Sequence, residues 1–260
     1  MKGNHITSDA LIIVIMLVLA CAIFSRRHVD KINTMKREGV SVQYQVLGRK
    51  SGKPVILLHG NGGRHEDLSV MAAQLDSAGY LVFAMDSRGQ GANEPLPEYH
   101  YIDMAEDVFA LVEKEKLKAP AVFGWSDGGI IALQTEVLHP GTFSMICTSG
   151  ANIFPECVEN FEEFWQQYDS LGNPVQLPPL TYMMTVEPQM TAGDMQTIGC
   201  PALIVAGEHD LILEEHTRLI ADNIPQGELL ILPGEDHGSH IWKNPKMGNI
   251  LIEWLRKNKY

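Results

Sequence analysis

The chain has 260 residues, of which 45% are hydrophobic and 20% are charged, and its formal net charge is −12. This length and apolar fraction suffice for one α/β domain with its own core, and they exclude a disordered or fibrous protein. An acidic surface repels phosphate backbones, so we expect no nucleic-acid partner. The four cysteines lack the spacing of a zinc site or a disulfide scaffold, and we expect neither a metal nor a cofactor.

The N-terminal residues form a separate hydrophobic segment. Residues 10–24 (ALIIVIMLVLACAIF) carry no charge and are almost wholly apolar. This run is shorter than the roughly 20 residues that a spanning helix usually needs, although residues 6–8 extend it. We assign residues 1–30 to an N-terminal hydrophobic anchor or signal segment and residues 31–260 to the folded domain. Membrane association would then run through residues about 6–24.

Three forms of this segment are compatible with the sequence. A single-pass anchor is favoured, because Arg26, Arg27 and Lys31 follow the apolar run closely and such charges resist translocation. A cleaved signal peptide would give a secreted form, and the small residues around Cys21 offer a cleavage site. A lipoprotein would be acylated at Cys21, but the apolar residues after it argue against that form. The side of the membrane stays open.

From Val40 onward, short apolar runs alternate with amphipathic stretches. Most of the central runs are continuously apolar, as strands covered on both faces must be. This alternation predicts a mainly parallel, doubly wound sheet. The predicted strands are Val42–Leu47, Val55–Leu58, Leu81–Met85, Ala121–Gly124, Ser144–Thr148, Ala202–Ala206 and Leu229–Leu232. The predicted helices are Glu66–Ala78, Met104–Lys116, Ser126–Leu138, Glu214–Asn223 and Pro245–Lys257.

The loop after the second predicted strand reads HGNGG at residues 59–63. It does not resemble a phosphate-binding loop, because it has neither a G-x-G-x-x-G pattern nor a following Lys-Ser/Thr pair. Its glycines allow the backbone to approach a substrate closely. Asn61 N–H is therefore our candidate for one donor of an oxyanion hole. The alternative is an ordinary glycine-rich turn.

The segment GWSDGG at residues 124–129 lies between an apolar strand and a predicted helix. This is the G-x-S-x-G pattern in the strand–turn–helix setting that indicates a nucleophile. The backbone of such a turn is strained, and Gly124 and Gly128 avoid a collision where strand and helix converge. We predict that Ser126 is the nucleophile and that Asp127 N–H is the second oxyanion-hole donor.

The stretch from about residue 151 to 190 interrupts the alternation. It has no strand pattern and concentrates aromatic and methionine side chains. We interpret it as a short helical cap insertion over the sheet. Part of it must pack on itself as a satellite core, and its underside is expected to form the acyl side of a pocket.

A nucleophilic serine needs a base and a carboxylate that orients the base. In this architecture both follow the serine, at the carboxyl ends of later strands. Asp210 follows one predicted strand and His237 follows the next. We assign Asp210 as the acid and His237 as the base. His209 and His240 are the rival bases, and Glu208 is the rival acid.

These segments together resemble the α/β-hydrolase superfamily, from about residue 40 to the C-terminus. The resemblance rests on HGNGG at 59–63, DSRGQG at 86–91, GWSDGG at 124–129, GEHD at 207–210 and His237. The turn at residues 124–129, which we call the elbow, and the short cap are most similar to biphenyl-hydrolase-like (valacyclovir hydrolase-like) serine esterases. The resemblance implies the same roles for Ser126, Asp210 and His237, and a structural role for residues 86–91. Two departures are the hydrophobic N-terminus and Asn93, where Ser is common.

The side chain of Asp127 has two interpretations. A carboxylate beside the nucleophile would receive the cationic amine of an aminoacyl ester, as the resemblance suggests. An Asp at the start of a helix is also favoured by the helix dipole alone. The sequence leaves both open.

The sequence therefore predicts a metal-free serine hydrolase that cleaves an ester, lactone or thioester through an acyl-enzyme. Its partner would be a small-molecule acyl substrate. A carbon–carbon bond hydrolase and an acyltransferase share this machinery, and a non-enzymatic ligand-binding member of the fold is a third alternative. The natural substrate and the oligomeric state are not determined by the sequence.

Overall fold

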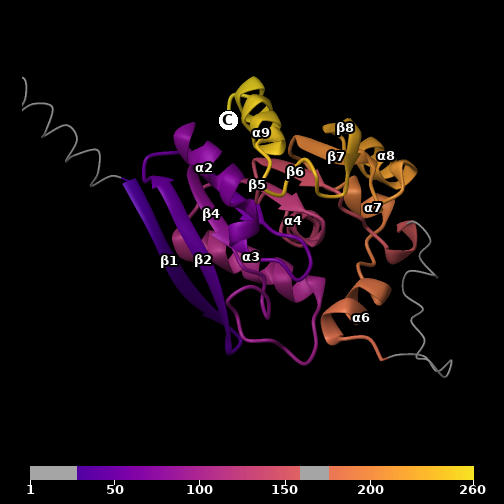
Figure 1. The fold of residues 1–260 in the computed structure, drawn as a ribbon, viewed down its shortest axis with the longest axis horizontal. Helices are drawn as coiled ribbons and strands as arrows, with labels where there is room; N and C mark the ends of the chain where they lie inside the picture. The colour runs from indigo at the N-terminus through magenta and orange to yellow at the C-terminus, as the bar shows by residue number, and fades with distance from the viewer. Residues whose placement is uncertain (1–27, 159–175) are drawn as a thin grey trace, which may run out of the picture.

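The computed structural model describes residues 28–158 and 176–260, and its central feature is an eight-stranded sheet (Figure 1). The strand order is β1-β2-β4-β3-β5-β6-β7-β8. The ladders from β4 to β8 are all parallel, whereas β2 is antiparallel to both of its neighbours. The prediction of a mainly parallel sheet is confirmed. The strands are β1 His28–Arg37, β2 Val40–Arg49, β3 Pro54–Leu58, β4 Leu81–Met85, β5 Ala121–Trp125, β6 Met145–Ser149, β7 Ala202–His209 and β8 Gly227–Asp236.

The central strands are buried on both faces, as their unbroken apolar sequences require. Every residue of β6 is buried, and β3 is buried from its second residue to its last. One hydrophobic cluster lies on each face of the sheet. Helices α3 (Tyr101–Glu115), α4 (Asp127–Leu138) and α8 (Glu214–Asn223) cover one face, and α2 (Ser69–Ser77) and α9 (Lys246–Lys257) pack together over the other.

The helices follow the predicted pattern with shifted ends. Helix α8 has the predicted bounds, and α3 begins three residues earlier than the predicted Met104, at Tyr101. The predicted helix Glu66–Ala78 divides into a short 3₁₀ helix, η1 (His65–Leu68), and α2. Helix α4 begins at Asp127, so Ser126 lies at its N-cap and not inside it.

The edge strand β1 was not predicted. It forms a hairpin with β2 through Glu38 and Gly39, both of which have positive φ angles. Residues 28–30, which the sequence analysis grouped with the N-terminal segment, belong to this strand. An edge strand needs no continuous apolar run, and Asp30, Lys31 and Ile32 are exposed, so its sequence carries little strand signal.

The cap insertion lies between β6 and β7. Its described parts are η2 (Pro155–Cys157), α6 (Pro179–Val186) and α7 (Ala192–Met195). Residues 159–175 of the predicted cap lie outside the described residues. Met183 and Met190 are buried in the main core, and Met190 N–H donates to Ile153 O at 2.9 Å. The two ends of the insertion are thereby fixed to each other and to the sheet.

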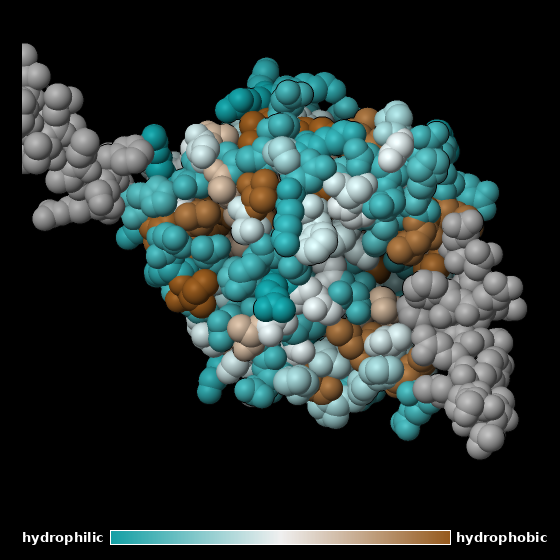
Figure 2. Space-filling model, in the orientation of Figure 1, coloured by the Kyte–Doolittle hydropathy of each residue, from teal (hydrophilic) through white to brown (hydrophobic). Residues whose placement is uncertain are grey.

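The predicted N-terminal hydrophobic segment also lies outside the described residues, which begin at His28. Within residues 28–158 and 176–260, every helix is too short or too polar to cross a bilayer. On the face that Figure 2 shows, hydrophobic residues form separate small patches in a largely hydrophilic surface. The exposed large hydrophobic side chains of the described chain are Ile32, Ile102, Leu138, Tyr182, Val186, Leu213 and Trp242.

Candidate active site

Ser126 occupies the sharp turn between β5 and α4. Its backbone angles, φ 54° and ψ −119°, are unusual for a residue with a side chain and show the expected strain. Ser126 N–H donates to Ser149 O at 2.8 Å, which fixes the turn to the end of β6. A Cβ at Gly124 would collide with the backbone of Gly128, and one at Gly128 would collide with the backbone of Leu58. The turn therefore needs both glycines.

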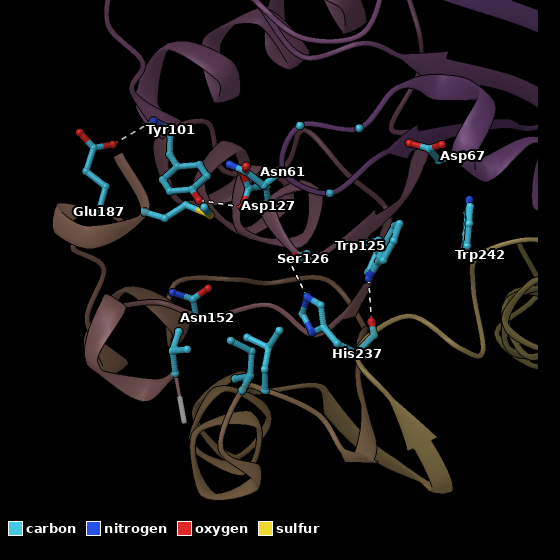
Figure 3. Close-up of a pocket in the computed structure, with 17 residues that line it drawn as sticks. Asn61, Asp67, Tyr101, Trp125, Ser126, Asp127, Asn152, Glu187, His237 and Trp242 are labelled. Carbon is cyan, nitrogen blue, oxygen red and sulfur yellow. Dashed lines mark hydrogen bonds between the residues drawn. The ribbon is translucent and has the colours of Figure 1, made fainter. Parts of the chain in front are cut away.

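The structure brings Ser126, His237 and Asp210 together (Figure 3 shows the Ser126–His237 pair). Asp210 and His237 are the first residues after β7 and β8. His237 Nε2 lies 2.9 Å from Ser126 Oγ, and His237 Nδ1 lies 2.6 Å from Asp210 Oδ1. The Asp210 carboxylate favours the tautomer in which Nδ1–H donates to it, so that Nε2 can accept the serine proton.

The Asp210 carboxylate is buried and is held by a backbone hydrogen bond in addition to its contact with His237. Its side chain is 1% exposed, and its Oδ1 also accepts Ile212 N–H at 3.0 Å. The rival residues from the sequence do not contact Ser126. Glu208 accepts Gly234 N–H at 2.8 Å, and the buried His240 ring bonds to Ser149 Oγ at 2.7 Å. His209 is exposed at the end of β7.

Two residues that affect the position of His237 were missed in the sequence analysis: Trp125 bonds to it, and Gly150 leaves room for its ring. Trp125 Nε1–H donates to His237 O at 2.8 Å. Gly150 follows β6 with a φ of +65°, and a Cβ there would lie 2.6 Å from His237 Cε1. The sequence signal that could have indicated Gly150 is a glycine directly after the strand that neighbours β5.

The loop at residues 59–63 lies against the elbow. A Cβ at Gly60 would be 3.4 Å from Ser126 Cβ. Gly62 N–H donates to Gln90 Oε1 at 2.8 Å, and Ser87 N–H donates to His59 Nε2 at 3.0 Å. The segment at residues 86–91 thus supports this loop. No described residue accepts a hydrogen bond from the N–H of Asn61 or of Asp127, which leaves both candidate oxyanion donors available to a ligand.

Asp127 is 3% exposed, and its carboxyl group receives two hydrogen bonds. Asn61 Nδ2 donates to its Oδ2 at 2.8 Å, and the Tyr101 hydroxyl donates to its Oδ1 at 2.9 Å. Burial raises the pKa of Asp127 to about 6, against the two hydrogen bonds and the nearby His237, which lower it. Tyr101 was not predicted as a site residue, because the predicted helix began after it.

A pocket of about 440 Å³ opens beside Ser126 (Figure 3). Its walls are partly apolar. The described residues that line it include three carboxyl groups and no Lys or Arg. The insertion contributes Asn152, Val158, Met184 and Glu187 to these walls. The other lining residues are Gly60, Asn61, Gly62, Gly63, Asp67, Tyr101, Trp125, Ser126, Asp127, Leu211, Ile212, His237 and Trp242.

In the described part of the chain, one group of side chains has the spacing of metal ligands. The ligand atoms of His65, Glu66 and Asp86 lie within 4.8 Å of one another. His65 bonds to Asp86 through both its backbone N–H, at 2.6 Å, and its ring Nδ1, at 2.8 Å. The polar groups of these residues bond to one another, and none of the three residues lines the pocket.

Comparison with known proteins assigns the chain to a family. Residues 53–193, more than half of the chain, match the family model of the alpha/beta hydrolase fold. The chain belongs to the α/β-hydrolase family. This α/β hydrolase is 26% identical to the human protein named serine hydrolase BPHL in an alignment 230 positions long that covers 78% of this chain and 79% of the relative. The similarity to biphenyl-hydrolase-like proteins is thereby confirmed.

Solved structures show the same fold. The esterase RhEst1 from Rhodococcus sp. ECU1013 superposes with a TM-score of 0.71 at 19% identity, over 87% of this chain and 98% of that one. The meta-cleavage product hydrolase CumD from Pseudomonas fluorescens IP01 superposes with a TM-score of 0.67 at 18% identity, over 87% and 98%. At these identities the likeness concerns the fold alone.

Proposed function

We propose that this α/β hydrolase is a serine hydrolase that cleaves a carboxylic ester or a related acyl bond, such as a lactone or thioester. The observation that carries the proposal is the hydrogen-bonded series Asp210–His237–Ser126, whose serine lines the pocket. The similarity to a human protein named serine hydrolase supports it.

The geometry supports a two-stage reaction. His237 Nε2 takes the proton of Ser126 Oγ as the oxygen attacks the acyl carbon, and Asp210 stabilises the imidazolium that forms. The N–H groups of Asn61 and Asp127 bind the oxyanion of the tetrahedral intermediate. His237 then gives its proton to the leaving group, and the acyl group stays on Ser126. Water, activated by the same histidine, attacks the acyl-enzyme and releases the acid.

The test replaces Ser126 by Ala in the full chain. We expect kcat on a neutral short-chain aryl ester to fall about 10⁶-fold, as it does when a triad serine is lost. A fluorophosphonate should label the wild-type chain and not this variant. Ser77→Ala is the matched control, because this serine is exposed on α2 and its hydroxyl donates to Ala73 O within its own helix.

Other results would select other functions. Turnover that survives in Ser126→Ala contradicts the assignment of the nucleophile. Labelling of Ser126 without hydrolysis of any ester would favour an acyltransferase or a carbon–carbon bond hydrolase. Absence of both labelling and turnover would favour a non-enzymatic ligand-binding protein on the same fold.

A further inference from the structure

We propose that the side chains of Asn61, Asp127 and Tyr101 form an oxyanion brace, which holds the two oxyanion-hole amides at a fixed separation. These three are then positioning residues: their side chains act on the reaction through the placement of backbone N–H groups. The inference rests on the proposed function, since an oxyanion hole has a role only if Ser126 attacks a carbonyl.

The first step is the contact between Asn61 and Asp127. Asn61 lies in the loop after β3 and Asp127 begins α4, 66 residues later, yet Asn61 Nδ2 lies 2.8 Å from Asp127 Oδ2. These are the same two residues whose N–H groups face no acceptor in the described chain. A side-chain hydrogen bond between them therefore restricts the distance between the two donors. Donors that are fixed before the reaction stabilise an oxyanion without reorganisation.

The second step is the support that Asp127 receives from Tyr101. Tyr101 is 1% exposed, and its hydroxyl donates to Asp127 Oδ1 at 2.9 Å. The backbone N–H of Tyr101 donates to Glu187 Oε2 at 2.9 Å. In Figure 3, Tyr101 lies between Glu187 and Asp127, with Asn61 beside Asp127. The brace thus reaches from the cap to the loop at residues 59–63.

The brace differs from a role for Asp127 in binding a substrate amine. Each of its two oxygens already accepts a hydrogen bond from a donor of the protein, and its side chain is buried. A brace acts in the transition state, so its loss lowers kcat on every ester. An amine-binding carboxylate acts on cationic substrates, so its loss affects aminoacyl esters alone.

Replacement of Asp127 by Asn separates these two roles. The amide removes the negative charge but keeps both hydrogen bonds, because its oxygen can accept from Asn61 and its NH₂ group can donate to the Tyr101 hydroxyl oxygen. Replacement by Ala removes the charge and both hydrogen bonds. Asn61→Ala keeps the backbone N–H of residue 61 and removes only the side-chain contact.

The experiment compares kcat and KM of the full chain on two aryl esters with the same leaving group, one neutral and one α-aminoacyl. We expect Asn61→Ala and Asp127→Ala each to lower kcat on both esters about 10- to 100-fold, since displacement of a catalytic group by an ångström costs up to about that much. KM should change little. The kcat of Asp127→Asn should be much closer to the wild-type value than that of Asp127→Ala. The kcat of the double variant Asn61→Ala/Asp127→Ala should be no lower than that of the slower single variant.

Two further variants complete the design. Tyr101→Phe should lower kcat less than Asp127→Ala does, because the hydrogen bond from Asn61 remains. Tyr182→Phe is its matched control, since Tyr182 is 56% exposed on α6 and does not line the pocket, and kcat should stay at the wild-type value. If Asp127→Ala does not fold, as judged by its thermal unfolding, Asn61→Ala and Asp127→Asn decide the question.

Three results would overturn the brace. Wild-type kcat in Asn61→Ala shows that the side-chain contact does not position the amides. A loss in Asp127→Asn that equals the loss in Asp127→Ala and is confined to the aminoacyl ester shows that the charge binds substrate. Absence of Ser126-dependent turnover in the wild-type chain overturns the proposed function together with the brace, whereas the first two results leave the proposed function intact.

Discussion

At the scale of single residues, Gly150 leaves room for the His237 ring between Ser126 and Asp210. With Ala at this position, the added Cβ would lie 2.6 Å from His237 Cε1 and 2.7 Å from His237 Nδ1. The imidazole would have to shift from its position between Ser126 and Asp210. We expect Gly150→Ala to lower kcat on the neutral ester about 100-fold, as for a misplaced catalytic base. Steady-state kinetics with the full chain measures the effect.

Gly141→Ala is the control for backbone strain. Gly141 also has a positive φ, +86°, but a Cβ there would have no neighbour within 4 Å. Both variants should lose stability of about 1 kcal/mol, because L-residues disfavour positive φ. Only Gly150→Ala should lose activity. Equal kcat in the two variants would contradict the steric role of Gly150.

At the scale of elements, α8 holds the start of the cap through a buried histidine. His216 Nε2 accepts Ile153 N–H at 3.0 Å, and burial lowers the pKa of His216 to about 4. Between pH 6.5 and 4 the unfolded chain binds this proton and the folded chain does not, so the free energy of unfolding falls as the pH falls. At pH 5 the loss is about 2 kcal/mol relative to pH 7. Urea unfolding of wild type and His216→Gln at both pH values measures it.

The glutamine keeps an acceptor for Ile153 N–H and does not titrate, so this variant should lose less stability between pH 7 and 5 than wild type. His100 provides a control of opposite sign. The hydrogen bond to Glu187 raises the pKa of His100, so this residue stabilises the fold at low pH and loses that contribution as the pH rises. His100→Gln should therefore be more acid-sensitive than wild type. Identical pH dependence in all three chains would contradict both assignments.

At the scale of the whole molecule, Asp107 connects three segments that are distant in the sequence. It lies on α3 with no exposed surface, and it accepts Arg37 Nε–H from the end of β1 and Arg88 Nε–H from the segment after β4, each at 2.7 Å. Asp107→Ala leaves the buried Arg88 guanidinium without this carboxylate. We expect the free energy of unfolding to fall by about 3–5 kcal/mol, measured by urea denaturation.

A surface ion pair provides the comparison. Glu214 and Arg218 lie one turn apart on α8, and their side chains are 47% and 54% exposed. Glu214→Ala should cost less than about 1 kcal/mol, because water screens an exposed pair. If Asp107→Ala lowers the free energy of unfolding no more than Glu214→Ala does, the buried ion pairs of Asp107 stabilise the fold no more than a surface contact.

The sequence by itself determined the parallel sheet, the bounds of α8 and the elbow around Ser126. These features depend on neighbours along the chain: apolar runs for buried strands, a repeat of about 3.6 residues for helices, and glycines where strand and helix converge. The edge strand β1 was missed for the same reason, because a strand with one neighbour and exposed polar residues lacks that local pattern.

Only the tertiary structure decided which side chains meet at the pocket. Ser126 and His237 are 111 residues apart in the sequence, Trp125 reaches the His237 carbonyl, and Asn61 bonds to Asp127 across 66 residues. The assignment of Asp210 and His237 relied on their predicted places after successive strands. The structure confirms these places, because β7 ends at His209 and β8 ends at Asp236. Gly150 and Tyr101 carried no comparable local signal. Their roles arise from packing between distant segments, which spacing along the chain does not encode.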